Sequence, residues 1–206
     1  MIHQKINLIQ SLLNHYFPNP EIPLNHFSPY TLLIATVLSA QCTDQRVNQV
    51  TKILFEIAPT PEKMLLIPLR RLEEIIRPCG LYQTKAKYLH SLSKILVEKH
   101  DGKVPKTFNK LEDLPGVGHK TASVVLGHAF QIPAFPVDTH IHRLAKRWGL
   151  SSGKSVLQTE KDLKKLFDQK DWEKIHLQMI YFGRTFCKAK GHDPKKCPIC
   201  SALQTT

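Results

Sequence analysis

The stretch Leu114-Pro-Gly-Val-Gly-His-Lys-Thr-Ala122 decides how this chain is interpreted. Gly116 and Gly118 are able to adopt positive φ without a Cβ clash, so they predict a tight turn. Small and apolar residues then recur at helical spacing, which predicts a helix over about residues 119–130. A glycine turn that opens into a helix exposes backbone N–H groups, which attract a phosphate. Lys120 lies in the first turn of that helix.

A carboxylate follows 18 residues after Lys120, at Asp138 in the segment Val137-Asp-Thr-His-Ile-His-Arg143. A phosphate-binding turn, an amine nucleophile and a carboxylate together indicate chemistry on a nucleic acid. Each group also has a simpler interpretation. Lys120 is able to serve as a plain phosphate contact, and Asp138 as the N-cap of a helix that begins near Thr139.

The composition favours a polyanionic partner. The 206 residues contain 29 Lys and Arg against 17 Asp and Glu, which gives a net charge of +12 and an isoelectric point near 9.6. Such an excess predicts affinity for nucleic acid, although a solvated basic surface has the same composition. No apolar run is long enough to span a bilayer, and residues 1–5 do not begin a secretory signal. We therefore expect a cytoplasmic protein.

The apolar spacing predicts an all-α fold. No alternation of apolar and polar residues typical of a strand persists anywhere in the sequence. A nearly continuous apolar run at residues 30–38 predicts a buried helix. Amphipathic helices are predicted at residues 2–16 and 44–57, between Gly80 and Asp101, and around Val156 to Phe167.

Four blocks occur in order along the chain: Leu38-Ser-Ala-Gln-Cys-Thr-Asp44, Gly80-Leu81-Tyr82, the glycine turn and the Asp138 segment. Together they resemble the endonuclease III family of helix–hairpin–helix DNA glycosylases. The resemblance implies two helical domains. Residues 22–132 would form a six-helix barrel whose helix–hairpin–helix motif covers about 107–130, and residues 1–21 with 133–206 would form the second domain. Lys120 and Asp138 would then lie on opposite sides of a cleft.

The resemblance also implies the activity. The chain would be a bifunctional DNA glycosylase and abasic-site lyase of base excision repair, acting as a monomer of bacterial type on damaged double-stranded DNA. It would remove oxidised or damaged pyrimidines and cleave the strand by β-elimination. The helix N-terminus and nearby basic residues would disfavour the ammonium form of Lys120. A non-catalytic DNA-binding protein and a monofunctional glycosylase are the alternatives.

The same resemblance assigns DNA contacts. Gln41 would enter the space that an extruded nucleotide leaves, and Leu81 would act as an apolar wedge on the opposite side of the stack. A helix-terminal Gln and a core Leu are the alternatives, and the second is common for leucine. The remaining predicted contacts are Gly116, Gly118, His140 and Arg143.

The C-terminal cysteines depart from the family pattern. Cys187, Cys197 and Cys200 have the spacing C-x9-C-x2-C, whereas the family shows C-x6-C-x2-C-x5-C and holds a [4Fe–4S] cluster. The fourth position falls on Thr206, and three thiolates do not complete a four-cysteine cluster. His192 is able to supply a fourth ligand for iron or zinc, and Asp193 is a further candidate for zinc. The three retained cysteines favour a labile [4Fe–4S] cluster, and the alternative is a metal-free loop whose lysines contact phosphates.

Overall fold

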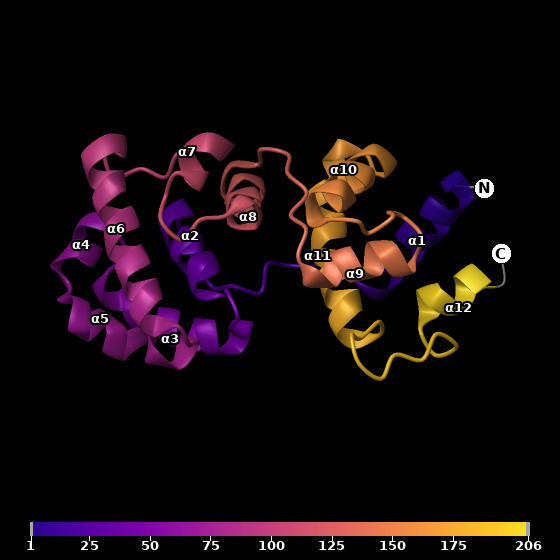
Figure 1. Ribbon diagram of the computed structural model, residues 1–206, viewed down its shortest axis with the longest axis horizontal. Helices are drawn as coiled ribbons and strands as arrows, with labels where there is room; N and C mark the ends of the chain where they lie inside the picture. Colours follow the sequence, from indigo (N-terminus) through magenta and orange to yellow (C-terminus); the bar gives the residue numbers. More distant parts are fainter. Residues whose placement is uncertain (1, 205–206) are drawn as a thin grey trace. The chain divides into compact units, whose positions relative to one another are not determined.

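A computed structural model describes residues 2–204, so Thr206 lies outside the described residues. All the regular secondary structure of this part is helical, which confirms the predicted all-α fold (Figure 1). The chain divides into two compact units. One contains residues 22–132, and the other contains the described residues of 1–21 and 133–206. None of the helices within residues 2–204 is both long and apolar enough to cross a bilayer.

The unit of residues 22–132 is built around one buried helix. Every residue of Tyr30–Leu38 is buried, and nearly all of them are apolar. The buried Thr36 hydroxyl donates a hydrogen bond to the Leu32 carbonyl. The helices are α2 (Pro29–Leu38), α3 (Asp44–Ile57), α4 (Pro61–Leu66), α5 (Leu69–Ile76), η1 (Arg77–Cys79), α6 (Tyr82–His100), α7 (Phe108–Glu112) and α8 (His119–Phe130). The buried helix α2 packs against α8, while α6 packs against α4 and α5.

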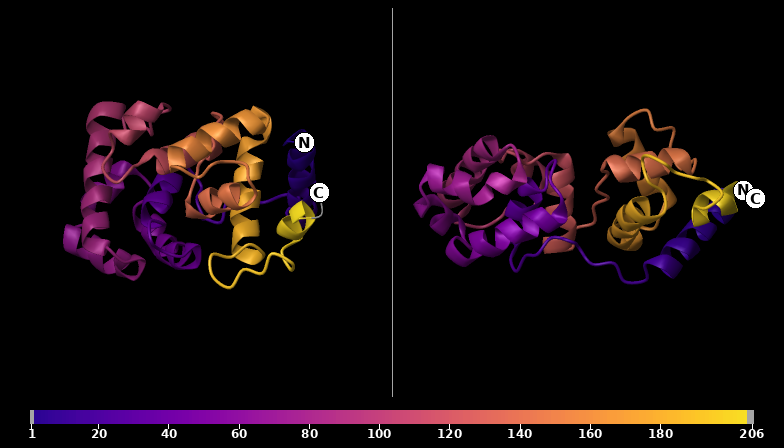
Figure 2. Two further views of the ribbon diagram at one scale, coloured as in Figure 1. Left: turned by 45° about the vertical axis from the view of Figure 1, so that its right-hand side comes forward. Right: turned by 90° about the horizontal axis from the view of Figure 1, so that it is seen from below.

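The second unit is organised around α11 (Trp172–Thr185), which packs against α1 (Ile2–Tyr16) and α9 (Thr139–Arg147). Its other helices are α10 (Val156–Leu166), η2 (Gln169–Asp171) and α12 (Pro198–Gln204). After α11 the chain forms an open loop and returns, so that α12 lies beside α1 (Figure 2). Two distant stretches of sequence thus share one apolar core, which includes Ile9, Leu13, Trp148 and Phe182.

Candidate functional site

Of the two glycines in the turn between α7 and α8, only Gly116 has the positive φ that the sequence predicts. Gly116 has φ +80°, and a Cβ added there would lie 2.7 Å from the Tyr88 Cδ2 atom. Gly118 has φ −96°, and a Cβ there would meet no atom within 4 Å. The expectation of positive φ at Gly118 is therefore wrong. Its backbone is extended because it is the N-cap residue of α8, a position where non-helical φ and ψ are usual.

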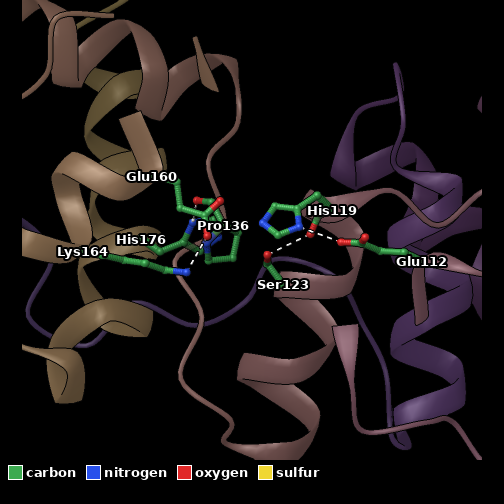
Figure 3. A network of polar contacts seen from close by, with 7 residues as sticks. All are labelled: Glu112, His119, Ser123, Pro136, Glu160, Lys164 and His176. Carbon is green, nitrogen blue, oxygen red and sulfur yellow. Dashed lines mark hydrogen bonds and ion pairs between the residues drawn. The ribbon is translucent and has the colours of Figure 1, made fainter. Parts of the chain in front are cut away.

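Side chains of α7 and α8 hold the N-terminus of α8 in place. The His119 ring stacks on Phe108 at 5.0 Å, and its Nδ1 lies 2.7 Å from Glu112 Oε1. The Ser123 hydroxyl donates to the His119 carbonyl at 2.8 Å (Figure 3). Because Gly118, the N-cap residue, has no side chain, it supplies no side-chain acceptor to the first N–H groups of α8. Such groups form a site for an anion, including a phosphate.

Lys120 is the second residue of α8, and its side chain is half-buried. It therefore starts from the first turn of α8, which presents the N-terminal N–H groups of the helix.

Asp138 is the N-cap residue of α9, as one interpretation of the sequence predicted. Its Oδ1 accepts a hydrogen bond from the Ile141 N–H at 2.8 Å, which fixes the carboxylate. His176 of α11 is buried, and its Nδ1 lies 2.8 Å from the carbonyl of Pro136, which is two residues before Asp138 (Figure 3). A carbonyl only accepts, so Nδ1 carries the proton. His176 was not predicted from the sequence, because its partner is 40 residues away.

Gln41 and Leu81 share an unusual backbone and an exposed position. Their φ values are +53° and +48°, in the left-handed region that non-glycine residues seldom adopt. Leu81 is 59% exposed, so the alternative of a core leucine is wrong. A strained backbone in an exposed residue persists only where the surrounding structure holds it, and such residues concentrate at functional sites.

Lys85 supplies that support for both turns. Its buried Nζ donates to the carbonyls of Leu38 and Ala40 at 2.8 Å, and to that of Cys79 at 2.9 Å. Ala40 precedes Gln41, and Cys79 lies two residues before Leu81. An ammonium group has three donors, and all three are satisfied here. Burial lowers the pKa of Lys85, while the neighbouring Cys79 and Cys42 oppose that shift.

Lys85 was not predicted as a site residue, although the sequence contains a signal for it. Lys85 lies four residues before Leu89, in line with the apolar stripe that continues to Leu92 and Leu96. A lysine inside such a stripe indicates either a stem packed on the core or a buried amine with partners. The partners come from residues 38–40 and 79, which no local pattern connects to α6.

Cys42 and Cys79, which the sequence left as isolated small residues, are neighbours. Cys79 is buried and Cys42 is half-buried. Burial, together with the adjacent Cys42 thiol, raises the pKa of Cys79 to about 12. The two side chains are therefore in contact, one from each of the turns that carry Gln41 and Leu81.

The two predicted DNA contacts of α9, His140 and Arg143, lie close together, and Arg143 also bonds within its own unit. Arg143 Nη2 donates to the Cys187 carbonyl at 3.0 Å and the Gly183 carbonyl at 3.3 Å, and it lies 3.2 Å from His140 Nδ1. Burial lowers the pKa of Arg143. The guanidinium thus ties α9 to the end of α11, and its role in DNA contact stays a prediction.

The C-terminal cysteines gather with a histidine into what we call the Cys–His site, formed by Cys187, His192, Cys197 and Cys200. One ligand atom from each of the four residues lies within 4.8 Å of the others. The three cysteines are buried and His192 is half-buried. Hydrogen bonds from Cys197 and Arg147 lower the pKa of Cys187 to about 5. The arrangement is able to hold a metal.

Asp193, the other candidate ligand, does not join the site. It is exposed, and its Oδ1 accepts a hydrogen bond from the Lys195 N–H at 3.0 Å. That bond shapes the loop between His192 and Cys197. The choice between His192 and Asp193 that the sequence left open is therefore decided for His192 by the geometry.

Residues 34–169 match the family model of the HhH-GPD superfamily base excision DNA repair proteins. The chain is 43% identical to endonuclease III of Bacillus subtilis (strain 168), over 96% of this chain and 91% of that protein. It is 40% identical to endonuclease III of Synechocystis sp., over 98% of this chain and 90% of that protein.

Two solved structures have the same fold at similar identity. A non-covalent endonuclease III–DNA complex matches with a TM-score of 0.92 and 42% identity, over 99% of each chain. A trapped endonuclease III–DNA covalent intermediate matches with a TM-score of 0.91 and 44% identity, over 96% of this chain and 93% of that chain. The chain therefore belongs to the endonuclease III family, the DNA N-glycosylases and abasic-site lyases of base excision repair within the HhH-GPD superfamily.

Proposed function

We propose that this protein removes oxidised or otherwise damaged pyrimidines from duplex DNA, and then cleaves the strand through Lys120. The single observation that carries the assignment of Lys120 is its place in the first turn of α8, directly after the glycine turn whose last residue, Gly118, is the N-cap. That position supplies an amine next to a phosphate-binding element. A purely water-using glycosylase does not need an amine there.

The proposed chemistry has two stages. The neutral Lys120 amine attacks the sugar C1′, the bond between C1′ and the base breaks, and the base leaves with the bonding electron pair. Opening of the sugar ring gives a Schiff base between Nζ and C1′. The Schiff base acidifies the C2′ proton; its removal forms a C2′–C3′ double bond and expels the 3′ phosphate. Water then hydrolyses the imine and releases the enzyme.

Asp138 is proposed to stabilise the positive charge that develops on the sugar and to assist proton transfers. Its N-cap bond supports this role, because the carboxylate is held without needing to reorganise during the reaction. The bond from His176 to the Pro136 carbonyl fixes the preceding backbone. His176 is in this proposal a positioning residue for Asp138.

Gln41 and Leu81 are proposed to stabilise DNA from which the damaged nucleotide has been extruded. Extrusion costs a few kcal/mol of stacking and pairing, which groups that occupy the vacated space offset. Their exposure and held backbone support this role, because a rigid probe loses little conformational freedom on insertion. We infer a monomer that acts on double-stranded DNA in the cytoplasm, with both candidate catalytic groups supplied by one chain.

The Cys–His site is proposed to order the basic loop near it, and no step of the reaction runs through it. Exposed lysines of that loop would contact phosphates without reading sequence. These lysines are Lys188, Lys190, Lys195 and Lys196.

Borohydride trapping on a duplex with one abasic site tests the assignment. The wild-type protein should give a covalent adduct, and Lys120→Gln should give none while still binding the duplex. Lys63→Gln, an exposed lysine of α4, is the matched control and should trap normally. Asp138→Asn keeps a good N-cap, so it should fold normally but remove bases far more slowly. Wild-type cleavage by Lys120→Gln would overturn the mechanism.

A further inference from the structure

We propose that Cys187, His192, Cys197 and Cys200 bind one zinc ion, in place of the four-cysteine iron–sulfur cluster that the family resemblance implies. The proposal rests on the distances between the ligand atoms, on the identity of the fourth ligand and on the loop that presents it. It does not depend on the assignment of Lys120 or Asp138.

The ligand atoms are spaced for one metal ion. Cys187 Sγ lies 3.8 Å from Cys200 Sγ and 3.4 Å from His192 Nε2, and all four ligand atoms lie within 4.8 Å of one another. Bonds of about 2.3 Å to sulfur and about 2.0 Å to nitrogen around tetrahedral zinc place the ligands roughly 3.5 to 3.8 Å apart. The separations of Cys187 Sγ from His192 Nε2 and from Cys200 Sγ therefore match a mononuclear tetrahedral site.

A [4Fe–4S] cluster needs a wider set of ligands. Each thiolate binds a different iron, so the thiolate sulfurs lie roughly 6 Å apart, separated by two Fe–S bonds and an iron–iron edge. The Cys–His site, whose atoms lie within 4.8 Å, does not have this width. It also offers three thiolates and an imidazole, whereas the cluster requires four thiolates in this family's pattern.

The loop presents His192 in the manner of a ligand. The spacing is C-x4-H-x4-C-x2-C, which contains the close cysteine pair that is common in structural zinc sites. Between Cys187 and Cys197 every residue is exposed except His192, which is half-buried and turned toward the cysteines. Nothing apolar in this loop explains why it folds back on α12. A metal ion bound by both ends of the loop and its middle does explain it.

The surroundings balance the charge of such a site. Three thiolates and a neutral imidazole around Zn²⁺ carry one net negative charge. Arg147 Nη1 donates to Cys187 Sγ at 3.1 Å and to the Lys188 carbonyl at 3.1 Å. A cationic donor to a ligating thiolate is an outer-shell interaction that stabilises the charge and orients the ligand.

Metal analysis tests the proposal directly. The full-length protein is produced in medium that contains both iron and zinc, and is purified in parallel with and without oxygen. We expect about one zinc per chain in both preparations, with no acid-labile sulfide and no visible absorbance. Iron with sulfide in the oxygen-free preparation would overturn the proposal, and so would a protein that contains no metal.

Replacement of zinc by Co²⁺ gives a readout that is independent of activity. Tetrahedral Co²⁺ bound by thiolates absorbs in the visible and near-ultraviolet, and the intensity should reach its limit at one ion per chain. His192→Ala should lose the metal to a competing chelator, while His192→Cys should keep it with a spectrum shifted toward four thiolates. Asp193→Ala is the matched control and should behave as wild type. Equal retention by His192→Ala and wild type would show that His192 is not a ligand.

Discussion

Two glycines two residues apart have different requirements, which only the backbone distinguishes. Gly116 combines positive φ with a close approach to Tyr88, whereas Gly118 is extended and faces open space. Gly116→Ala should therefore destabilise the fold by about 1 to 3 kcal/mol. Gly118→Ala should fold normally and weaken duplex binding, because its Cβ would stand where a phosphate approaches the backbone. Urea unfolding and duplex titration separate the two effects.

Gly127 provides the control for both variants. It lies inside α8, where an added Cβ meets no atom within 4 Å. Gly127→Ala should stabilise the helix by about 0.5 to 1 kcal/mol and leave DNA binding unchanged. If Gly118→Ala bound duplex as tightly as Gly127→Ala, the turn would not be a close phosphate contact.

Gln41 should matter only when a nucleotide has left the stack. Gln41→Ala is expected to weaken binding to a duplex with a stable abasic analogue roughly tenfold or more, and binding to intact duplex much less. Gln4→Ala, an exposed glutamine of α1, is the control and should change neither affinity. An equal loss on both duplexes would mean that Gln41 contributes to structure or to general backbone contact.

At the scale of elements, Lys85 joins the end of α2, the η1 turn and α6 through one ammonium group. Lys85→Met keeps the stem and removes the donors, which leaves three carbonyls of the two turns without their partner. Each buried acceptor without a donor costs about 1 to 3 kcal/mol, so we expect a loss of stability of about 3 kcal/mol or more. Urea unfolding measures this loss.

Lys85→Met should also affect function more than its loss of stability alone explains. Its affinity for the abasic analogue should be lower than that of the wild type, as for Gln41→Ala. The affinity is measured at a temperature where the variant is folded. Lys87 lies two residues after Lys85 on α6 and is exposed, so Lys87→Met is the control. It should change neither the stability nor the affinity for the abasic analogue. Normal discrimination between abasic and intact duplex by Lys85→Met would show that the turns hold their shape without the amine.

The helices were predictable where one apolar pattern runs unbroken. The predictions at residues 2–16, 44–57 and 119–130 agree with the helix bounds of the structure, and that at 30–38 differs by one residue. Helix α11 was missed, although it is the centre of its unit. It buries His176 and Gln178 along with its apolar residues, so its stripe is interrupted by polar side chains whose partners are distant in sequence.

The site was predictable where chemistry depends on neighbours in the sequence. The glycine turn, Lys120 and the N-cap role of Asp138 follow from short stretches. The support around them does not, because Lys85 reaches carbonyls 45 and 47 residues away, and Arg143 reaches residues 40 and 44 positions away. The gathering of His192 with the cysteines was one of several possibilities in the sequence, and folding of the loop selects it.

At the scale of the whole molecule, the net charge of +12 should govern binding to undamaged DNA. Phosphate contacts release counterions, so the logarithm of the binding constant should fall linearly with the logarithm of salt concentration. The slope should be nearly independent of the duplex sequence, because backbone contacts carry no base information. Titrations of two unrelated duplexes over a range of salt provide the measurement. A flat response would contradict a phosphate-dominated interface.

The left-handed backbone at Gln41 and Leu81 has a consequence for how this protein responds to selection in the laboratory. Glycine adopts that conformation without the penalty that a Cβ imposes, and both side chains are exposed, so replacing either residue by glycine removes strain at little cost in packing. A selection for heat resistance alone would therefore favour glycine at these two positions. If Gln41 and Leu81 have the roles proposed above, the survivors would be more stable proteins that hold extruded-nucleotide DNA poorly, and a screen without a repair readout would score them as improvements.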